Sequence, residues 1–183
     1  MKPKRLQTNY TTPVDKTILL ERVADQFKTL KHIDRIAELN KSNPIYSRWI
    51  RKYNLDKIQE PERIIFLLAF YLAKFEPDHP NIQAIREPWR VAKDGLANCV
   101  DYTTFISGFL RHDLLRIPHT IKMISFDNSK NYSHIYTQTN GTTLDPVVGQ
   151  DQTGQERLKA NLSRIPYYNV EVPHTNKYTF NVK

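Results

Sequence analysis

The sequence predicts an α+β fold in which several helices precede an antiparallel sheet. Glycine and proline give the first indication, because all five glycines lie between positions 95 and 154, whereas the first 94 residues contain seven prolines and no glycine. Hydrophobic spacing gives the second: apolar residues recur at steps of three and four before residue 111 and alternate in several segments after it. A chain of 183 residues is long enough to bury one core, so we expect a single domain over residues 15–183.

A first helix is expected to begin at Asp15, after an irregular leader of residues 1–14. Apolar residues recur at steps of three and four from Leu19 to Ala37, which is the spacing of one helix face. Asp15 is a suitable N-cap residue for this helix, which should end near Asn40.

Two helices that open with proline should follow, because proline is favoured in the first turn of a helix. The first opens at Pro44 and the second at Pro61. The run 64–73 in the second helix is apolar on nearly all sides, which is typical of a helix buried in the centre of a domain. A further short helix is expected around residues 81–86 and should be broken before Pro88.

The chain after Cys99 predicts one more helix and then a sheet. The helix is indicated by apolar residues at helical spacing between 105 and 110. Asn140-Gly141 is a strong type I′ hairpin signal and should join two strands. The predicted strands cover residues 119–126, 132–139 and 142–148, with one or two more in the tail 161–183.

The net charge of +8 is concentrated in the first third of the chain. Residues 1–60 contain 13 Lys and Arg against 7 Asp and Glu, so the helical part at residues 15–80 should be basic. A basic face can meet nucleic acid or an acidic protein. No nucleic-acid-binding motif accompanies the charge, so we favour a solvated helical face over a nucleic-acid partner.

Several classes of protein are excluded by composition. The longest apolar run is about half as long as a bilayer-spanning helix, so no membrane span is expected. The first residues are basic without an apolar stretch behind them, so no secretory signal is expected. A single cysteine, Cys99, excludes an internal disulfide and a multi-cysteine metal site, and nothing in the sequence calls for a metal or a cofactor.

Cys99 lies in a pattern that suits a reactive thiol. In Asn98-Cys99-Val100-Asp101, Asn98 is a preferred N-cap residue, and an acid three positions later is typical of a capping box. Cys99 would then occupy the first helical turn, where the positive end of the helix dipole stabilises a thiolate and backbone N–H groups can bind an oxyanion. The alternative is a small, unreactive apolar residue that precedes a helix.

His134 and Asp145 are candidates for the base and its orienting acceptor. His134 lies in a predicted strand, and Asp145 follows the next strand, so the hairpin can bring the two side by side. A cysteine nucleophile needs such a base, and the base needs an acceptor that holds its ring. Taken singly, each residue has a structural alternative, as a strand histidine or a turn aspartate.

Residues from about 80 to 150 resemble transglutaminase-like cysteine enzymes. The segment from Ile85 to Phe105 is similar to their nucleophile segment, and the closest resemblance is to small members encoded by bacteriophages and mobile elements of Bacteroidetes-type bacteria. The later matching segments are Leu115-Arg-Ile-Pro118, Tyr132-Ser-His134-Ile-Tyr and Leu144-Asp145-Pro-Val. The resemblance implies a papain-like fold with a catalytic core at 81–150 and C-terminal strands at 151–183.

The resemblance also implies roles for single residues. Cys99 would be the nucleophile, His134 the general base and acid, and Asp145 the orienting acceptor. The family usually has Gly-Asp before its cysteine, where this chain has Ala97-Asn98, so we expect the helix cap to be kept and the local negative charge to be lost. The candidates for the oxyanion or substrate-cleft side chain are Trp89, Gln83 and Asn98, with packing or surface roles as the alternative.

Three functions follow as hypotheses. The first is a cysteine-dependent amide hydrolase or acyl transferase acting on a protein or peptide; we favour hydrolysis, as in a protease or deamidase, because a domain this small lacks modules that deliver an amine. The second is a non-catalytic structural or adaptor component of a bacteriophage particle on the same fold. The third is an intracellular regulator that binds a peptide at Cys99 without cutting it. The expected setting is the cytoplasm of a bacterial host or the virion.

Overall fold

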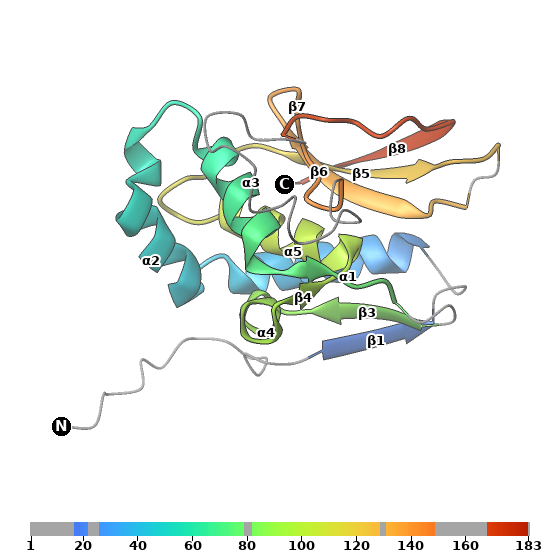
Figure 1. Ribbon diagram of the computed structural model, residues 1–183, viewed down its shortest axis with the longest axis horizontal. Helices are drawn as coiled ribbons and strands as arrows, with labels where there is room; N and C mark the ends of the chain where they lie inside the picture. The colour runs from blue at the N-terminus through green and yellow to red at the C-terminus, as the bar shows by residue number, and fades with distance from the viewer. Residues whose placement is uncertain (1–16, 22–25, 79–81, 129–130, 149–167, 183) are drawn as a thin grey trace.

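Helices precede an antiparallel sheet along the chain, so the predicted α+β class is confirmed (Figure 1). The computed structural model describes residues 17–21, 26–78, 82–128, 131–148 and 168–182. The helices are α1 (Gln26–Asn40), α2 (Pro44–Tyr53), α3 (Pro61–Leu72), α4 (Pro88–Asp94) and α5 (Cys99–Leu110), with a 3₁₀ turn η1 (Leu55–Lys57). The strands are β1 (Thr17–Glu21), β2 (Lys74–Phe75), β3 (Ile82–Arg86), β4 (Leu96–Ala97), β5 (Thr120–Ser125), β6 (His134–Thr139), β7 (Thr142–Leu144) and β8 (Asn176–Asn181).

The main sheet has the strand order β7-β6-β5-β8, with every neighbouring pair antiparallel. Asn140 and Gly141, which join β6 to β7, have φ angles of 49° and 79°. Positive φ at both central residues is the signature of a type I′ turn, so the hairpin prediction is confirmed. The tight turn sets the register of β6 against β7, with Thr137 opposite Leu144, and Asp145 therefore follows at the end of β7.

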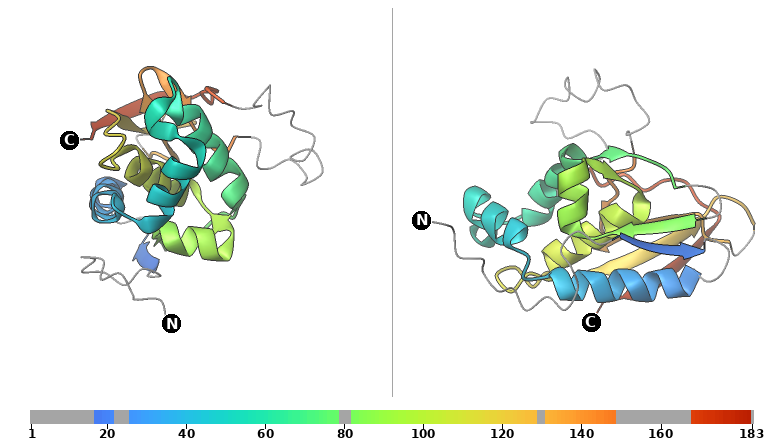
Figure 2. Two further views of the ribbon diagram at one scale, coloured as in Figure 1. Left: turned by 90° about the vertical axis from the view of Figure 1, so that its left-hand side faces the viewer. Right: turned by 90° about the horizontal axis from the view of Figure 1, so that it is seen from below.

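Helix α5 is the centre of the molecule. Every residue from Val100 to Leu110 is buried, including the polar residues Asp101, Thr103, Thr104 and Ser107. One apolar cluster joins α5 to α2 and α3, and a second joins its start to α1, β5 and β6. Figure 2 shows α2 at one end of the molecule and the strands of the main sheet extending toward the other.

The prediction that the helix with the run 64–73 occupies the centre is wrong. Helix α3 buries one face, which includes Ile65, Phe66 and Phe70, while Tyr71 is 45% exposed. An apolar sequence is compatible with either position, and α5 takes the central one because its residues also contact β3, β6 and α1.

The prediction that residues 15–80 are helical is wrong for the start of this segment. Thr17–Glu21 forms strand β1, which pairs antiparallel with Ile82–Arg86, so the short helix expected around 81–86 is also wrong. The run Thr-Ile-Leu-Leu satisfies the helical spacing that we used, but β-branched and apolar residues suit a strand equally well when a partner strand is available. The predicted N-cap Asp15, the leader 1–14 and the tail up to residue 167 lie outside the described residues. The described part of the tail contains strand β8, in agreement with the prediction of one or two strands there.

Helix α4 was not predicted, although Pro88 gives the same signal as Pro44 and Pro61. Pro88 is the first residue of the helix, and Glu87 before it is extended, with φ −66° and ψ 153°. The restriction that proline imposes on the preceding residue therefore separates β3 from α4. Within the described residues, no helix combines the length and apolar character needed to cross a bilayer.

Gly108 gives a test of how tightly α5 is packed. A Cβ at this position would lie 2.8 Å from the Tyr46 hydroxyl oxygen and 3.4 Å from the Ala37 carbonyl oxygen. We expect Gly108→Ala to lower the free energy of unfolding by about 1–3 kcal/mol, because overpacking outweighs the better helix propensity of alanine. Urea denaturation measures this change.

Tyr46→Phe provides the matched control, because it removes the hydroxyl that donates to the Phe105 carbonyl and leaves the ring in place. The double variant with Gly108→Ala should lose less stability than the sum of the two single variants. If the two stability losses are strictly additive, the contact with the Tyr46 hydroxyl is not what disfavours a side chain at position 108.

Candidate active site

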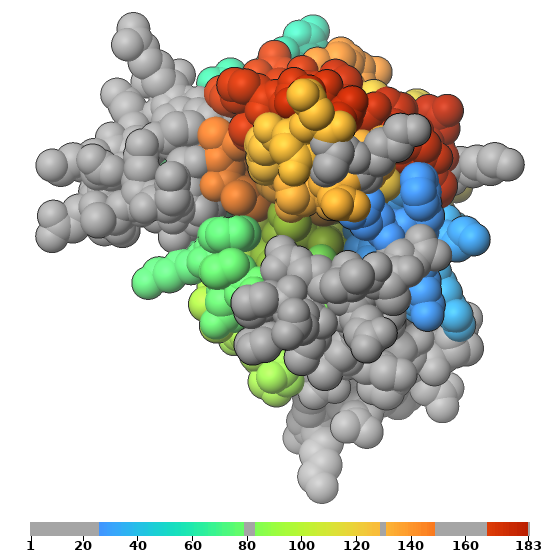
Figure 3. Space-filling model, turned by 90° about the vertical axis from the view of Figure 1, so that its right-hand side faces the viewer, coloured from blue at the N-terminus to red at the C-terminus, as the bar shows by residue number. Residues whose placement is uncertain are grey.

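A cavity of about 820 Å³ opens beside the N-terminus of α5. Its walls come from the start of α1, the segment that follows β2, the connection between β5 and β6, and the chain just after Asp145. Figure 3 shows the surface hollowed where the yellow β5–β6 segment, the blue start of α1 and the green segment before residue 79 meet. Cys99 and His134 both line this cavity, and Asp145 is buried behind them.

Cys99 is the first residue of α5, and the predicted capping box is confirmed. The Asp101 N–H donates to the Asn98 side-chain oxygen at 2.8 Å, and the Asn98 N–H donates to the Asp101 carboxylate at 3.0 Å. The Tyr102 N–H donates to the Asn98 carbonyl. Among the described residues, the N–H groups of Cys99 and Val100 have no partner, so they are free to bind an anion beside the Cys99 sulfur.

The Asp101 carboxylate also holds this helix end against β3. It is fully buried and accepts the Arg86 N–H at 2.6 Å and an Arg86 guanidinium N–H at 2.7 Å. Burial raises the pKa of Asp101 to about 6, against the opposing effect of the bonds from Arg86 and Asn98. The position of Cys99 therefore depends on the ion pair between Arg86 of β3 and Asp101 of α5, two residues that are 15 positions apart in the chain.

His134 and Asp145 are in direct contact. His134 Nε2 lies 2.5 Å from a carboxylate oxygen of Asp145, which is 1% exposed. A carboxylate only accepts, so Nε2 donates and the Nδ1 atom is left for the thiol. The sequence-derived candidates Cys99, His134 and Asp145 thus meet in one place, on a helix, a strand and the end of the next strand.

The pKa of His134 is raised from its ordinary value of 6.5 to about 10. Burial lowers this pKa, because it disfavours a charged ring, but hydrogen bonds to Asp145 and to the Cys99 sulfur, together with their negative charge, outweigh burial. The imidazolium is therefore the favoured form of His134 at neutral pH, in contact with a sulfur on one side and a carboxylate on the other.

Asn98 lines the cavity, but its side chain hydrogen-bonds to neighbouring segments of the protein. Its amide nitrogen donates to the Asp78 carboxylate and to the Ala84 carbonyl, each at 2.9 Å. The amide is thereby fully occupied, so Asn98 orients the end of α5. The expected loss of local negative charge is wrong, because Asp78 brings a carboxylate to this position from a different segment of the chain.

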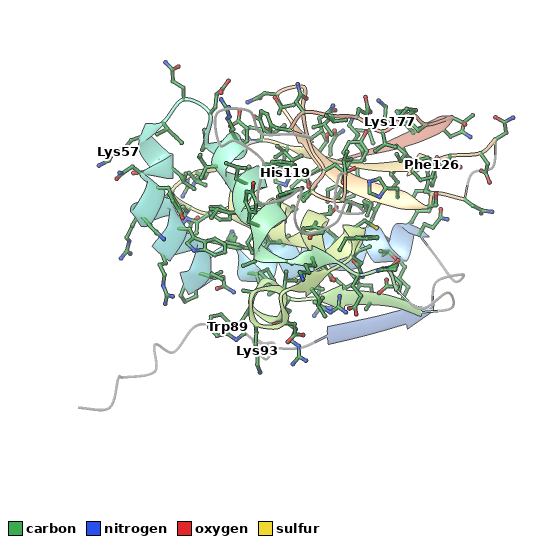
Figure 4. All side chains as sticks on the ribbon, viewed as in Figure 1. Lys57, Trp89, Lys93, His119, Phe126 and Lys177 are labelled. Atoms are coloured by element: carbon green, nitrogen blue, oxygen red, sulfur yellow. The ribbon has the colours of Figure 1, made fainter. Side chains whose placement is uncertain are left out.

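The other two cleft candidates have different locations. Gln83 lines the cavity, and its amide nitrogen donates to Asp78 and, at 3.3 Å, to the Ala84 carbonyl. Trp89 lies on α4, is 43% exposed and does not line the cavity; Figure 4 shows it near Lys93, far from Phe126 at the end of β5. The backbone N–H groups of Cys99 and Val100, at the start of α5, are the oxyanion donors that we assign in the described part of the chain.

Two aromatic rings flank the imidazole of His134. The Phe126 ring is 6.3 Å away with an interplanar angle of 23°, and the Tyr136 ring is 6.1 Å away at 28°. Tyr136 lies two residues from His134 on one face of β6, so strand periodicity predicts this contact. Phe126 reaches the ring only because β5 pairs with β6, and no local sequence signal indicates it.

Comparison with protein-family models, with curated proteins and with solved structures finds no match for this chain. Among the described residues, no group of three or more His, Cys, Asp or Glu side chains could hold a metal ion.

The contact of His134 with Asp145 predicts a specific pH dependence of stability. A histidine whose pKa is raised in the folded state stabilises it fully below about pH 6.5, and this contribution is lost as the pH rises toward about 10. We expect His134→Gln to lower the free energy of unfolding at about pH 6 and to have a smaller effect at about pH 9.5. Urea denaturation at the two pH values measures the difference.

His32→Gln is the control, since His32 is a half-buried histidine of α1 that does not line the cavity. It should leave the pH dependence of the wild type unchanged. An equal loss of stability at both pH values in His134→Gln would contradict the raised pKa.

The contact of Asn98 with Asp78 predicts that aspartate is not tolerated at position 98. Asn98→Asp would bring a second carboxylate against Asp78 and against the Ala84 carbonyl at a buried position. We expect the free energy of unfolding at neutral pH to fall by about 3 kcal/mol, as for a buried charge without a partner. Urea denaturation measures this loss.

Asp78→Asn in the Asn98→Asp background should recover part of the loss, because the new amide can donate to the introduced carboxylate. Wild-type stability of Asn98→Asp alone would show that the two side chains do not meet.

Proposed function

We propose that this protein is a cysteine-dependent amide hydrolase of the transglutaminase-like, papain-like type. The observation that carries the proposal is the hydrogen bond of His134 to the buried Asp145 carboxylate at the wall of a cavity that Cys99 also lines, with the Cys99 sulfur close enough to raise the pKa of His134. A helix headed by the nucleophile, followed by antiparallel strands that carry the base and its acceptor, supports the same assignment. A protein or peptide in a bacterial cytoplasm or a virion would be the substrate.

The first half of the reaction forms a thioester. The Cys99 thiolate attacks the carbonyl carbon of an amide, and the carbonyl electrons move to the oxygen, which the N–H groups of Cys99 and Val100 stabilise. The His134 imidazolium then gives its Nδ1 proton to the amide nitrogen, the carbon–nitrogen bond breaks and an amine leaves.

The second half releases the acid. The negative charge of Cys99 helps to raise the pKa of His134, so the pKa falls when the sulfur is acylated and neutral His134 becomes able to act as a base. His134 takes a proton from water, the hydroxide attacks the thioester carbon and the carbon–sulfur bond breaks. A carboxylic acid leaves, the thiolate returns and His134 is again protonated. Asp145 keeps the ring in one tautomer throughout.

Hydrolysis and transfer differ only in the acceptor that attacks the thioester. Water gives a protease or a deamidase, whereas an amine gives a cross-linked product. We favour water as the acceptor, so the proposed reaction is hydrolysis.

A second candidate is a non-catalytic structural or adaptor role in a bacteriophage particle. Arg48, Arg51 and Lys52 are exposed on α2, and Figure 2 shows this helix at the end of the molecule away from the sheet. A basic surface of this kind fits an acidic partner. This role needs no reaction at Cys99, so a measurement of thiol reactivity separates the two candidates.

The reactivity of Cys99 toward iodoacetamide tests the proposal. Because His134 stays protonated beside the sulfur, we expect alkylation at about pH 6 to be at least tenfold faster than that of free cysteine. His134→Gln should reduce the rate to that of free cysteine, whereas His32→Gln should not change it. Equal rates for wild type, His134→Gln and free cysteine would refute the enzyme and favour the adaptor.

The type of product identifies the reaction. The wild type and Cys99→Ala are incubated with a mixture of peptides, with and without an added primary amine, and the products are analysed by mass spectrometry. New peptide termini would indicate a protease, and conversion of glutamine to glutamate would indicate a deamidase. Attachment of the amine would indicate a transferase. Each of these should be absent with Cys99→Ala.

A further inference from the structure

The cavity beside Cys99 differs in charge from the rest of the molecule. The chain has a net charge of +8, yet no Lys or Arg is among the described residues that line the cavity. Asp78 is the only acidic residue in this lining, and its carboxylate already accepts from Gln83, Ala84 and Asn98. Among the described lining residues, His134 is the only side chain that carries a positive charge, and Asp145 and the Cys99 sulfur already stabilise that charge. An anionic substrate group would therefore find no lysine or arginine in the described lining to replace the water that it loses on entry.

Apolar side chains form a large part of the cavity lining. Val100, Met123 and Ile135 are buried side chains that reach the cavity, at 2%, 3% and 5% exposure. Val147 and Val148, which follow Asp145, also line the cavity. An uncharged hydrocarbon group can enter such a site without losing a hydrogen-bond partner.

Phe126 is the residue that such a group would cover. It lines the cavity, is 53% exposed and stacks on His134 with 6.3 Å between the ring centroids. A large exposed aromatic ring next to a catalytic base contributes binding free energy when a ligand buries it. Figure 4 shows Phe126 where β5 ends, at the side of the molecule on which the cavity opens.

We infer that the substrate carries an uncharged, apolar group next to the amide that is cleaved, and that Phe126 is the residue that selects it. This inference rests on the proposed function, since it concerns the group adjacent to the bond that Cys99 attacks. The inference predicts that the enzyme discriminates against a substrate with an acidic group at this position. From its net charge of +8 alone, the protein would be expected to attract such a substrate.

Chloroacetamides that alkylate Cys99 and differ only in their nitrogen substituent test the inference. The substituents are benzyl, which is apolar, carboxymethyl, which is anionic, and 2-aminoethyl, which is cationic. The second-order rate constant for each reagent is divided by its rate constant with N-acetylcysteine. We expect the benzyl reagent to react with saturation kinetics and at least tenfold faster than either charged reagent, a factor that corresponds to about 1.4 kcal/mol.

Phe126→Ala should reduce the ratio of benzyl chloroacetamide to iodoacetamide reactivity by about tenfold. The matched control is Tyr71→Ala, which removes an aromatic ring of similar exposure (45%) from α3 outside the cavity and should leave this ratio unchanged. If Phe126→Ala slows both reagents by the same factor, Phe126 only positions His134 and the inference is overturned. Equal normalised rates for the three reagents with the wild type would overturn it as well.

Failure of the proposed function gives a different result. In that case His134→Gln does not change the rate with iodoacetamide, whatever the preference among the three chloroacetamides. A wild type that needs His134 for iodoacetamide reactivity and shows no preference for the benzyl reagent would retain the proposed function and reject the inference.

Discussion

The buried carboxylate of Asp101 is the interaction on which the arrangement of this site depends. It closes the capping box at the start of α5 and at the same time binds the backbone N–H and the guanidinium of Arg86 in β3. A carboxylate at 0% exposure is costly to bury, so it requires several donors, and these donors come from two different elements. The place of Cys99 relative to β3 follows, because Cys99 is two residues from Asp101 on the same helical turn.

The main sheet positions His134, the partner of Cys99, because His134 is the first residue of β6. Thr103, one turn along α5, is within hydrogen-bond distance of the Cys99 carbonyl and of the Ile135 carbonyl, at 2.8 Å and 3.3 Å. Its hydroxyl therefore links the helix that carries the thiol to the strand that carries His134. The tight turn at Asn140-Gly141 sets the register of β6 against β7, and Asp145 lies at the end of β7. Two local structures, a capped helix and a hairpin, thus meet at one buried contact.

The charge of the site is balanced within the cavity. His134 is held as an imidazolium by Asp145 and Cys99, and Asp78 is surrounded by amide donors. Lysine and arginine are absent from the described lining, although they outnumber the acids in the chain. Groups whose charge is already satisfied give a neutral, partly apolar cavity, which is the physical basis of the selectivity proposed for Phe126.

Local patterns in the sequence were sufficient for the capped helix at Asn98 and for the hairpin at Asn140-Gly141 that places Asp145 beside His134, because each depends on residues a few positions apart or on one short turn. The approach of Cys99 to this pair, which the resemblance implied, depends on the packing of α5 against β6. The same reasoning failed at Thr17–Glu21 and Ile82–Arg86, where each segment becomes a strand only through pairing with the other. The tertiary structure alone decided that α5 is central, that Asp78 contacts Asn98 and that Phe126 covers His134. These contacts join segments with no common local pattern, so packing and the satisfaction of buried polar groups determine them.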